Sequence, residues 1–178
     1  MKKGSDLRVI IPHDKKAQIW VETVTYTLIG LTIIGLLIAG IRPQIEKAQD
    51  KNLIKQIKES LEEINQKINE IRVIPGNQRK IILHIDKGAV TIDAENDLIV
   101  WRMMSSYEYS EPDLTITEGN LNITTVDGNP WEIVFELPFT SNITYDGLEI
   151  SRELRETSTS YDLIIKNEGQ NLDIRSMD

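Results

Sequence analysis

The sequence has no cysteine among its 178 residues, and its only histidines are His13 and His84. The absence of cysteine excludes disulfide scaffolds, thiolate metal sites and cysteine nucleophiles. It does not fix the compartment, because an exported protein can fold without disulfides. One histidine cannot build a catalytic triad without partners, and a zinc site needs several ligands at set spacings. We therefore expect His84 to be a packed or edge residue of a strand.

Motifs of common enzyme classes are missing as well: G-x-S-x-G, the P-loop and G-x-G-x-x-G do not occur. The oxygen-rich stretch from Asp93 to Asp97 lacks the glycine and terminal glutamate of an EF-hand, so a solvated turn is favoured over a calcium site. A membrane-tethered hydrolase with carboxylates far apart in sequence would leave no signature and stays open. We predict a protein that is not an enzyme and that holds no cofactor or metal.

Charge is distributed unevenly along the chain, although the formal net charge is only -8. Residues 1–17 carry five basic and two acidic side chains. From Arg42 onward there are 15 basic and 25 acidic residues. An acidic surface repels phosphate backbones, so nucleic acid is not expected as a partner.

The longest apolar stretch covers residues 19–41, and its polar members are Glu22 and four threonines. As a helix it rises about 35 Å, enough to cross a hydrocarbon core of roughly 30 Å. All five basic leader residues precede it and only Arg42 follows closely, so the positive-inside rule predicts a cytoplasmic leader and an exported C-terminal part.

Two other interpretations of this stretch are less favoured. A secretory signal peptide fits poorly, because the stretch is long and no A-x-A pattern closes it after Ala39 and Gly40. A buried core helix fits poorly because the apolar residues from Leu28 to Ile41 are too continuous for an amphipathic stripe.

Glu22 is the residue that a simple anchor does not explain. A carboxylate in an apolar helix costs about 2.5–3.5 kcal/mol on insertion scales and usually has a partner. Alternatively, Glu22 lies at the headgroup level and stays hydrated. The sequence from Lys15 to Glu22, K-K-A-Q-I-W-V-E, resembles the processing site of type IV pilin precursors. In those precursors a basic leader and a small residue precede the cleavage point, and glutamate is the fifth mature residue.

Gln18 makes this site similar to the archaeal class III signal peptide, whose pattern is Q-x-S-x-E-x-x-x-L. Trp20 and Tyr26 replace the serine and leucine of that pattern, and Ala17 stands where glycine is commoner. The resemblance implies cleavage between Ala17 and Gln18 by a membrane prepilin peptidase. It further implies that Glu22 becomes the counter-charge of the new α-ammonium on Gln18, in the same subunit or a neighbour.

Such pairing would select the correct register between subunits during assembly, because burying a charge without a partner costs free energy. The helix would then leave membrane lipid for a filament of identical subunits or other pilins. Gly35 and Ala39 lie four residues apart on one helix face, a small-xxx-small spacing that permits close helix packing.

A second helical pattern follows Pro43, which should kink or break the helix. Isoleucine and leucine recur between Ile54 and Ile71 at alternating spacings of three and four. This stripe either packs on the chain's own β domain, which we favour, or forms a coiled coil between subunits. We therefore expect helical segments at 18–41 and 44–72 of an N-terminal helix, 18–73, that ends before Pro75 and Gly76.

Residues 79–178 show short apolar alternations separated by turn residues, clearest in the strand from Trp131 to Leu137. Further strands are predicted at 80–85, 89–93, 98–102, 114–117, 121–125, 148–151, 161–165 and 172–175. The fold class is therefore α+β, with a long N-terminal helix packed on an antiparallel sheet or sandwich. Two sequons, at Asn122 and Asn142, would lie on the exported side and are possible N-glycosylation sites.

These observations favour a structural subunit, major or minor, of a type IV pilus-like filament used in adhesion or motility. The subunit would first be inserted in the cell membrane and then become part of an extracellular filament. The alternative is a single-pass signal-anchor protein that keeps its leader and displays a β-sandwich binding module at the cell surface.

Overall fold

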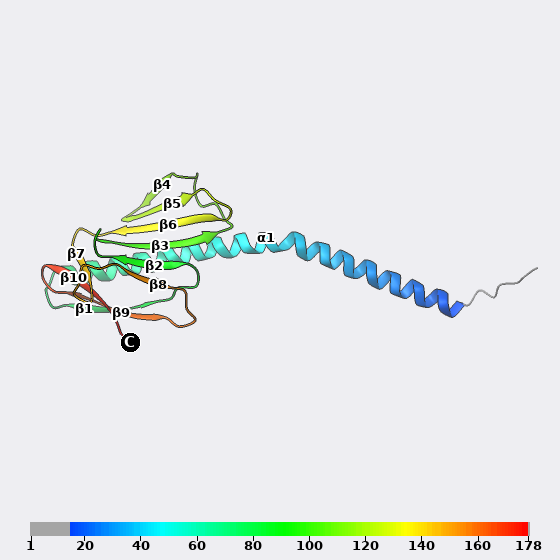
Figure 1. Ribbon diagram of the computed structural model, residues 1–178, viewed down its shortest axis with the longest axis horizontal. Coiled ribbons are helices and arrows are strands. Elements are labelled where there is room, and N and C mark those ends of the chain that lie inside the picture. Colours follow the sequence, from blue (N-terminus) through cyan, green and yellow to red (C-terminus); the bar gives the residue numbers. More distant parts are fainter. Residues whose placement is uncertain (1–14, 178) are drawn as a thin grey trace, which may run out of the picture. The chain divides into compact units, whose positions relative to one another are not determined.

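The computed structural model describes the backbone of residues 15–177 and the side chains of residues 19–177 (Figure 1). The chain divides into two compact units, one ending at Pro43 and the other beginning at Gln44. Most of the predicted leader, residues 1–17, lies outside the described residues. The second unit is called the helix–sheet unit below.

One long helix, α1 (Lys15–Arg72), opens the described part of the chain. Pro43 was expected to kink or break the helix, and the structure excludes the break: the helix is continuous through this residue. A proline inside a helix removes one backbone hydrogen bond and crowds the preceding turn. The helix accommodates both effects at Pro43 without losing its helical conformation.

Ten strands follow within the described residues, and they form two sheets. The six-stranded sheet has the order β4-β5-β6-β3-β2-β8, and the four-stranded sheet has the order β1-β9-β10-β7. The strands are β1 (Gln78–Leu83), β2 (Ala89–Asp93), β3 (Leu98–Ser105), β4 (Thr115–Glu118), β5 (Leu121–Val126), β6 (Trp131–Pro138), β7 (Asn142–Tyr145), β8 (Arg152–Arg155), β9 (Tyr161–Asn167) and β10 (Asn171–Ser176).

The predicted α+β class is confirmed, and the sheets are antiparallel apart from one pair. That pair is β10 with β7, which run parallel. It arises because the chain leaves the six-stranded sheet after β6, adds β7 to the edge of the other sheet, and returns for β8. The chain therefore alternates between the sheets, which ties them together around one core.

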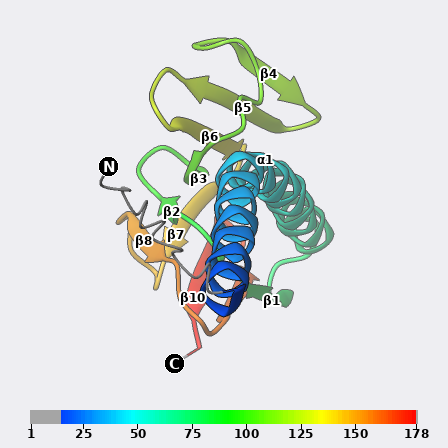
Figure 2. The same ribbon diagram turned by 90° about the vertical axis from the view of Figure 1, so that its right-hand side faces the viewer.

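The second half of α1 lies against both sheets, as Figures 1 and 2 show. Its predicted apolar stripe is buried in a core shared with both sheets, including Trp101 and Phe135, which are paired across β3 and β6. The six stripe residues are each at most 3% exposed: Ile54, Ile57, Leu61, Ile64, Ile68 and Ile71. The stripe thus packs within its own chain, so it is not available as a coiled-coil seam.

The C-terminal end of α1 is held by Asn167, a buried residue at the end of β9. Its side-chain amide donates hydrogen bonds to the carbonyl oxygens of Ile71 and Arg72, at 2.9 and 3.0 Å. Its backbone carbonyl accepts a hydrogen bond from the amide of Gly76 at 2.7 Å. Gly76 has φ of +87°, which a glycine adopts without strain. Helix termination was predicted at this point, and Asn167 supplies partners for carbonyl groups that the helix leaves unpaired.

Gly88, in the loop before β2, also has a positive φ, +88°. A Cβ atom at this position would overlap the backbone carbonyl of Arg102 on β3. Close approach of the two backbones therefore requires glycine here.

One strand prediction was wrong, and one observed strand was not predicted. Residues 148–151 are not a strand, because Asp146 and Gly147 form a tight turn that leaves Leu148 in an isolated bridge with Tyr145. The strand that follows is β8, which begins later. We did not predict β7, whose apolar alternation is limited to Ile143 and Tyr145.

Candidate functional site

The apolar segment, defined as residues 19–41, is the most exposed apolar part of the described chain. None of its large apolar side chains is buried, and Leu36 is 70% exposed. It belongs to a helix that is long and apolar enough to cross a membrane. An apolar surface of this extent needs lipid or protein to cover it.

The four threonines of the apolar segment do not bring unsatisfied polar groups into it. Each hydroxyl donates a hydrogen bond to the backbone carbonyl four residues earlier, at 2.8 to 3.0 Å. Side chains bonded in this way lose most of the cost of burial in an apolar medium. The segment is therefore compatible with lipid despite its threonine content.

Glu22 projects from the apolar segment and is exposed. The hydroxyl of Tyr26, one turn later, lies 3.5 Å from Oε1 of Glu22. A hydrogen bond of this length is weak, so the carboxylate retains most of its capacity to bind a stronger donor. Ala17 and Gln18, the residues of the predicted cleavage point, belong to the first turn of α1, and their side chains lie outside the described residues.

The glycines of the apolar segment are not required by contacts within the described chain. A Cβ atom added to Gly30, Gly35 or Gly40 would meet nothing within 4 Å. Gly35 and Ala39 lie on this open helix as predicted, and the structure contains no helix packed on their face within the described residues.

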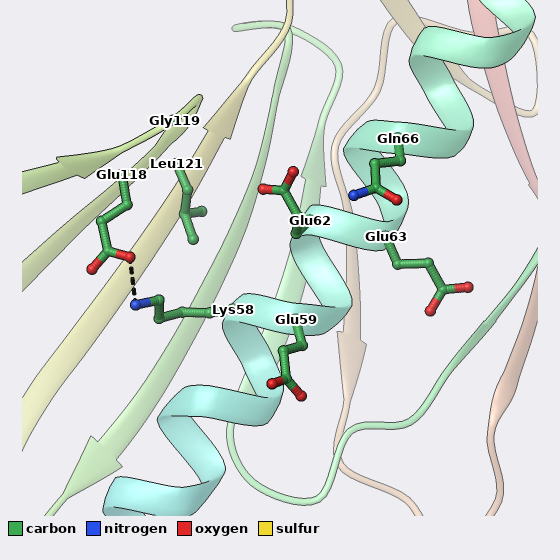
Figure 3. A pocket seen from close by; sticks show the side chains of 8 residues that line it. All are labelled: Lys58, Glu59, Glu62, Glu63, Gln66, Glu118, Gly119 and Leu121. Carbon is green, nitrogen blue, oxygen red and sulfur yellow. Dashed lines mark ion pairs between the residues drawn. The ribbon is translucent and has the colours of Figure 1, made fainter.

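A groove lies in the helix–sheet unit between α1 and the turn joining β4 to β5 (Figure 3). We call it the acidic groove. It has a volume of about 490 Å³ and one basic and four acidic side chains. Its lining residues are Lys58, Glu59, Glu62, Glu63, Gln66, Glu118, Gly119 and Leu121.

One wall of the acidic groove is fixed by Lys58, Tyr109 and Glu118. The ammonium of Lys58 lies 2.5 Å from Oε2 of Glu118 and 3.3 Å from the hydroxyl of Tyr109. The Tyr109 hydroxyl donates a short hydrogen bond to the other oxygen of Glu118. The hydrogen bond from Lys58 is the main cause that lowers the pKa of Glu118. Burial alone would lower the pKa of Lys58, but its bonds to Glu118 and Tyr109 outweigh burial and raise it.

The other acidic side chains of the groove have looser surroundings. Glu62 projects toward the β4–β5 side, whereas Glu59 and Glu63 point in other directions from the helix (Figure 3). Glu59 lies 3.6 Å from Lys55, and Glu63 lies 2.6 Å from Lys67. Glu62 forms no ion pair with any residue that the structure describes. Exposed pairs along a helix contribute little, so all three remain able to bind an external cation.

A second charged cluster, which the sequence did not reveal, surrounds Asp50 near the start of the helix–sheet unit. Its carboxylate is nearly buried and lies 2.5 Å from the ammonium of Lys87. The backbone amide and hydroxyl of Ser106 each donate a hydrogen bond to its other oxygen at 2.7 Å. Burial raises the pKa of Asp50, but the bonds from Lys87 and Ser106 outweigh burial and lower it. The cluster joins α1 to the β1–β2 loop and to the β3–β4 loop.

The predicted oxygen-rich turn after β2 is a hydrogen-bonded loop. The carboxylate of Asp93 accepts bonds from the backbone and side chain of Asn96 and from the hydroxyl of Ser151. The Asn96 side chain is the main cause that lowers the pKa of Asp93. Among the described residues there is no group of three or more histidine, cysteine, aspartate or glutamate side chains placed to hold a metal. His84 is exposed beside Asp86, not packed in the core.

Both sequon asparagines are on strands at the surface of the helix–sheet unit. Asn122 is half-buried on β5, and its side-chain carbonyl accepts a hydrogen bond from Thr117. Asn142 is exposed on β7, and its amide lies 3.3 Å from a carboxylate oxygen of Glu149. Thr144, the third residue of the second sequon, is buried and donates to Asp173.

Comparison of the chain with protein-family models, with curated proteins and with solved structures finds no match. The apolar segment and Glu22 were found from sequence, whereas the acidic groove was not, because it depends on β4 and β5 lying beside α1.

Proposed function

We propose that the chain is a structural subunit, major or minor, of a type IV pilus-like surface filament that serves adhesion or motility. The observation that carries this proposal is the exposed apolar segment of α1, which contains one carboxylate, Glu22, four residues after Gln18. The subunit would be inserted in the cell membrane with its leader in the cytoplasm and its helix–sheet unit outside, and would then enter the filament.

The exposed apolar segment supports assembly because its surface must be covered both before and after export. Lipid covers it in the membrane, and packed copies of the same segment would cover it in a filament. Gly30, Gly35 and Gly40 are open to close approach on their Cβ side, so a neighbouring helix can come near the backbone at these positions. Residues 15–22 resemble a prepilin processing site, and cleavage there would allow the segment to leave membrane lipid and enter a filament.

Glu22 supports the same proposal through its charge. In the packed core of a filament a carboxylate without a cation is strongly unfavourable. Cleavage after Ala17 would create a positive α-ammonium on Gln18, one helical turn before Glu22. Pairing of the two groups, within one subunit or between neighbours, would select the assembled register because a shifted register leaves both charges buried and unpaired.

Substitution of Glu22 tests the counter-charge directly. We expect Glu22→Ala to remain inserted in the membrane but to yield few or no filaments in sheared surface material viewed by negative-stain microscopy. Glu46→Ala is the matched control, because Glu46 is an exposed glutamate of the same helix beyond the apolar segment. Filaments of Glu22→Ala at the wild-type level would contradict the proposed role. Wild-type protein found only in membranes with its leader intact would instead favour a signal-anchor protein that displays a binding module.

A further inference from the structure

Charge on the exposed face of α1 in the helix–sheet unit changes sign along the helix. Lys51 and Lys55 lie at its N-terminal end, and Glu59, Glu62 and Glu63 follow; all five are exposed. Lys51 lies over the ring of Tyr107, with its ammonium 5.6 Å from the ring centre. Lys58, about two turns after Lys51, is engaged by Glu118 and Tyr109. The face thus has a basic patch, Lys51 and Lys55, followed by the acidic groove.

The acidic groove is suited to a cationic side chain delivered on another helix. Its lining carries a formal charge of -3, from one lysine and four glutamates. The bonds of Glu118 to Lys58 and Tyr109 hold the wall in place, so that ordering the groove on binding costs little.

We propose that the acidic groove binds the basic patch of a second copy of this chain, so that parallel neighbouring subunits are in register through Lys51 and Lys55 of one and Glu59, Glu62 and Glu63 of the other. This inference rests on the proposed filament function and adds the lateral contact that fixes the stagger between neighbours. A filament needs two different, complementary patches on every subunit, and the two ends of this helix face provide them.

The spacing of the charges along the helix sets the axial shift between two neighbouring parallel copies. Seven residues separate Lys55 from Glu62, and eight separate Lys51 from Glu59 and Lys55 from Glu63. Two parallel copies shifted by seven to eight residues, about 10–12 Å at 1.5 Å per residue, therefore bring three lysine–glutamate combinations together at once. An unshifted pair of copies would instead place like charges side by side.

Cysteine cross-linking tests this contact without interference, because the natural chain contains no cysteine. In a Lys55→Cys/Glu62→Cys variant the two positions are about 10.5 Å apart along one helix, which is further than a disulfide reaches. A disulfide must therefore join two copies, and repetition along a filament should give a ladder of covalent oligomers in sheared, mildly oxidised material. The matched control is Lys55→Cys/Glu153→Cys, whose second site is an exposed glutamate on β8.

The outcomes separate this inference from the proposed function. A ladder in the first variant, with none in the control or in either single variant, supports the contact. Filaments whose subunits begin at Gln18 but give no ladder, or give equal ladders in both variants, overturn the contact and leave the filament function standing. Absence of wild-type filaments overturns both.

Charge reversal provides an independent test that needs no oxidation. Lys55→Glu and Glu62→Lys should each lower the amount of subunit in sheared filaments by about twofold to fivefold at low salt, as expected for loss of an exposed pair. The combined variant should recover most of the loss. The differences should disappear in about 1 M salt, where the screening length falls to roughly 3 Å. Additive losses in the combined variant would overturn the contact.

Discussion

The carboxylate of Asp50 lies 2.5 Å from the ammonium of Lys87, and this ion pair joins α1 to the loop before β2. The side chain of Asp50 is 9% exposed, whereas that of Lys87 is 39% exposed. Two further hydrogen bonds from Ser106 complete the surroundings of the carboxylate. A buried carboxylate with these donors stabilises the attachment of the helix only while it is ionised.

We therefore predict that Asp50→Asn lowers the free energy of unfolding near neutral pH by about 1–3 kcal/mol. Folding lowers the pKa of Asp50, so its contribution is fully present above the pKa of the unfolded chain and is lost as the pH falls through the lower folded value. The difference between wild type and variant should thus shrink below about pH 4. Denaturant unfolding of the whole chain in detergent across this range measures it. A difference that stays constant down to about pH 2 would contradict the role of ionised Asp50.

Asn167 gives a second prediction, because its one side chain contacts three backbone groups. Two are the carbonyl oxygens of Ile71 and Arg72, and the third is the amide of Gly169. Asn167→Ala leaves these groups without their partner, and we expect it to destabilise the helix–sheet unit by about 1–3 kcal/mol. Thermal or denaturant unfolding monitored by circular dichroism measures the loss.

The matched control for that experiment is Asn69→Ala, at an exposed asparagine of the same helix whose amide lies 3.5 Å from the side-chain oxygen of Asn65. We expect a change within about 0.5 kcal/mol. Equal effects of the two substitutions would show that Asn167 does not hold the end of α1.

Local sequence pattern was enough to predict the elements whose side chains repeat regularly. The stripe from Ile54 to Ile71 predicted both the helix and its buried face, because spacings of three and four place these residues on one side. The alternation from Trp131 to Leu137 likewise predicted β6. The short strand β7 offered no comparable pattern, since its pairing depends on β10, nearly thirty residues later.

The functional residues divide in the same way. Those marked by a local sequence pattern could be predicted, and those that depend on distant segments could not. Glu22 was recognisable because it interrupts an apolar stretch within a spacing typical of prepilins. Asp50 resembled any charged residue on a helix surface, since the loops that bury it come from residues 87 and 106. The acidic groove required the β4–β5 turn to lie beside α1, which no local pattern indicates.

The two sequons give a further prediction, on the assumption that the helix–sheet unit is exported. We expect the mature protein to carry glycan mass at Asn122, Asn142 or both. Comparison of intact masses of wild type and Asn122→Gln/Asn142→Gln measures this directly, and the single variants assign the site. A mass difference equal to that of the two amino-acid substitutions alone would contradict glycosylation.

We propose that the apolar segment, after release from a basic leader, becomes the assembled part of a filament. Mass spectrometry of the N-terminal peptide of sheared surface material tests whether the leader is removed and the segment enters filaments. We predict a peptide that begins at Gln18 and retains Glu22 as its fifth residue. A peptide that begins at Met1, or recovery of the chain only from membranes, would contradict the claim.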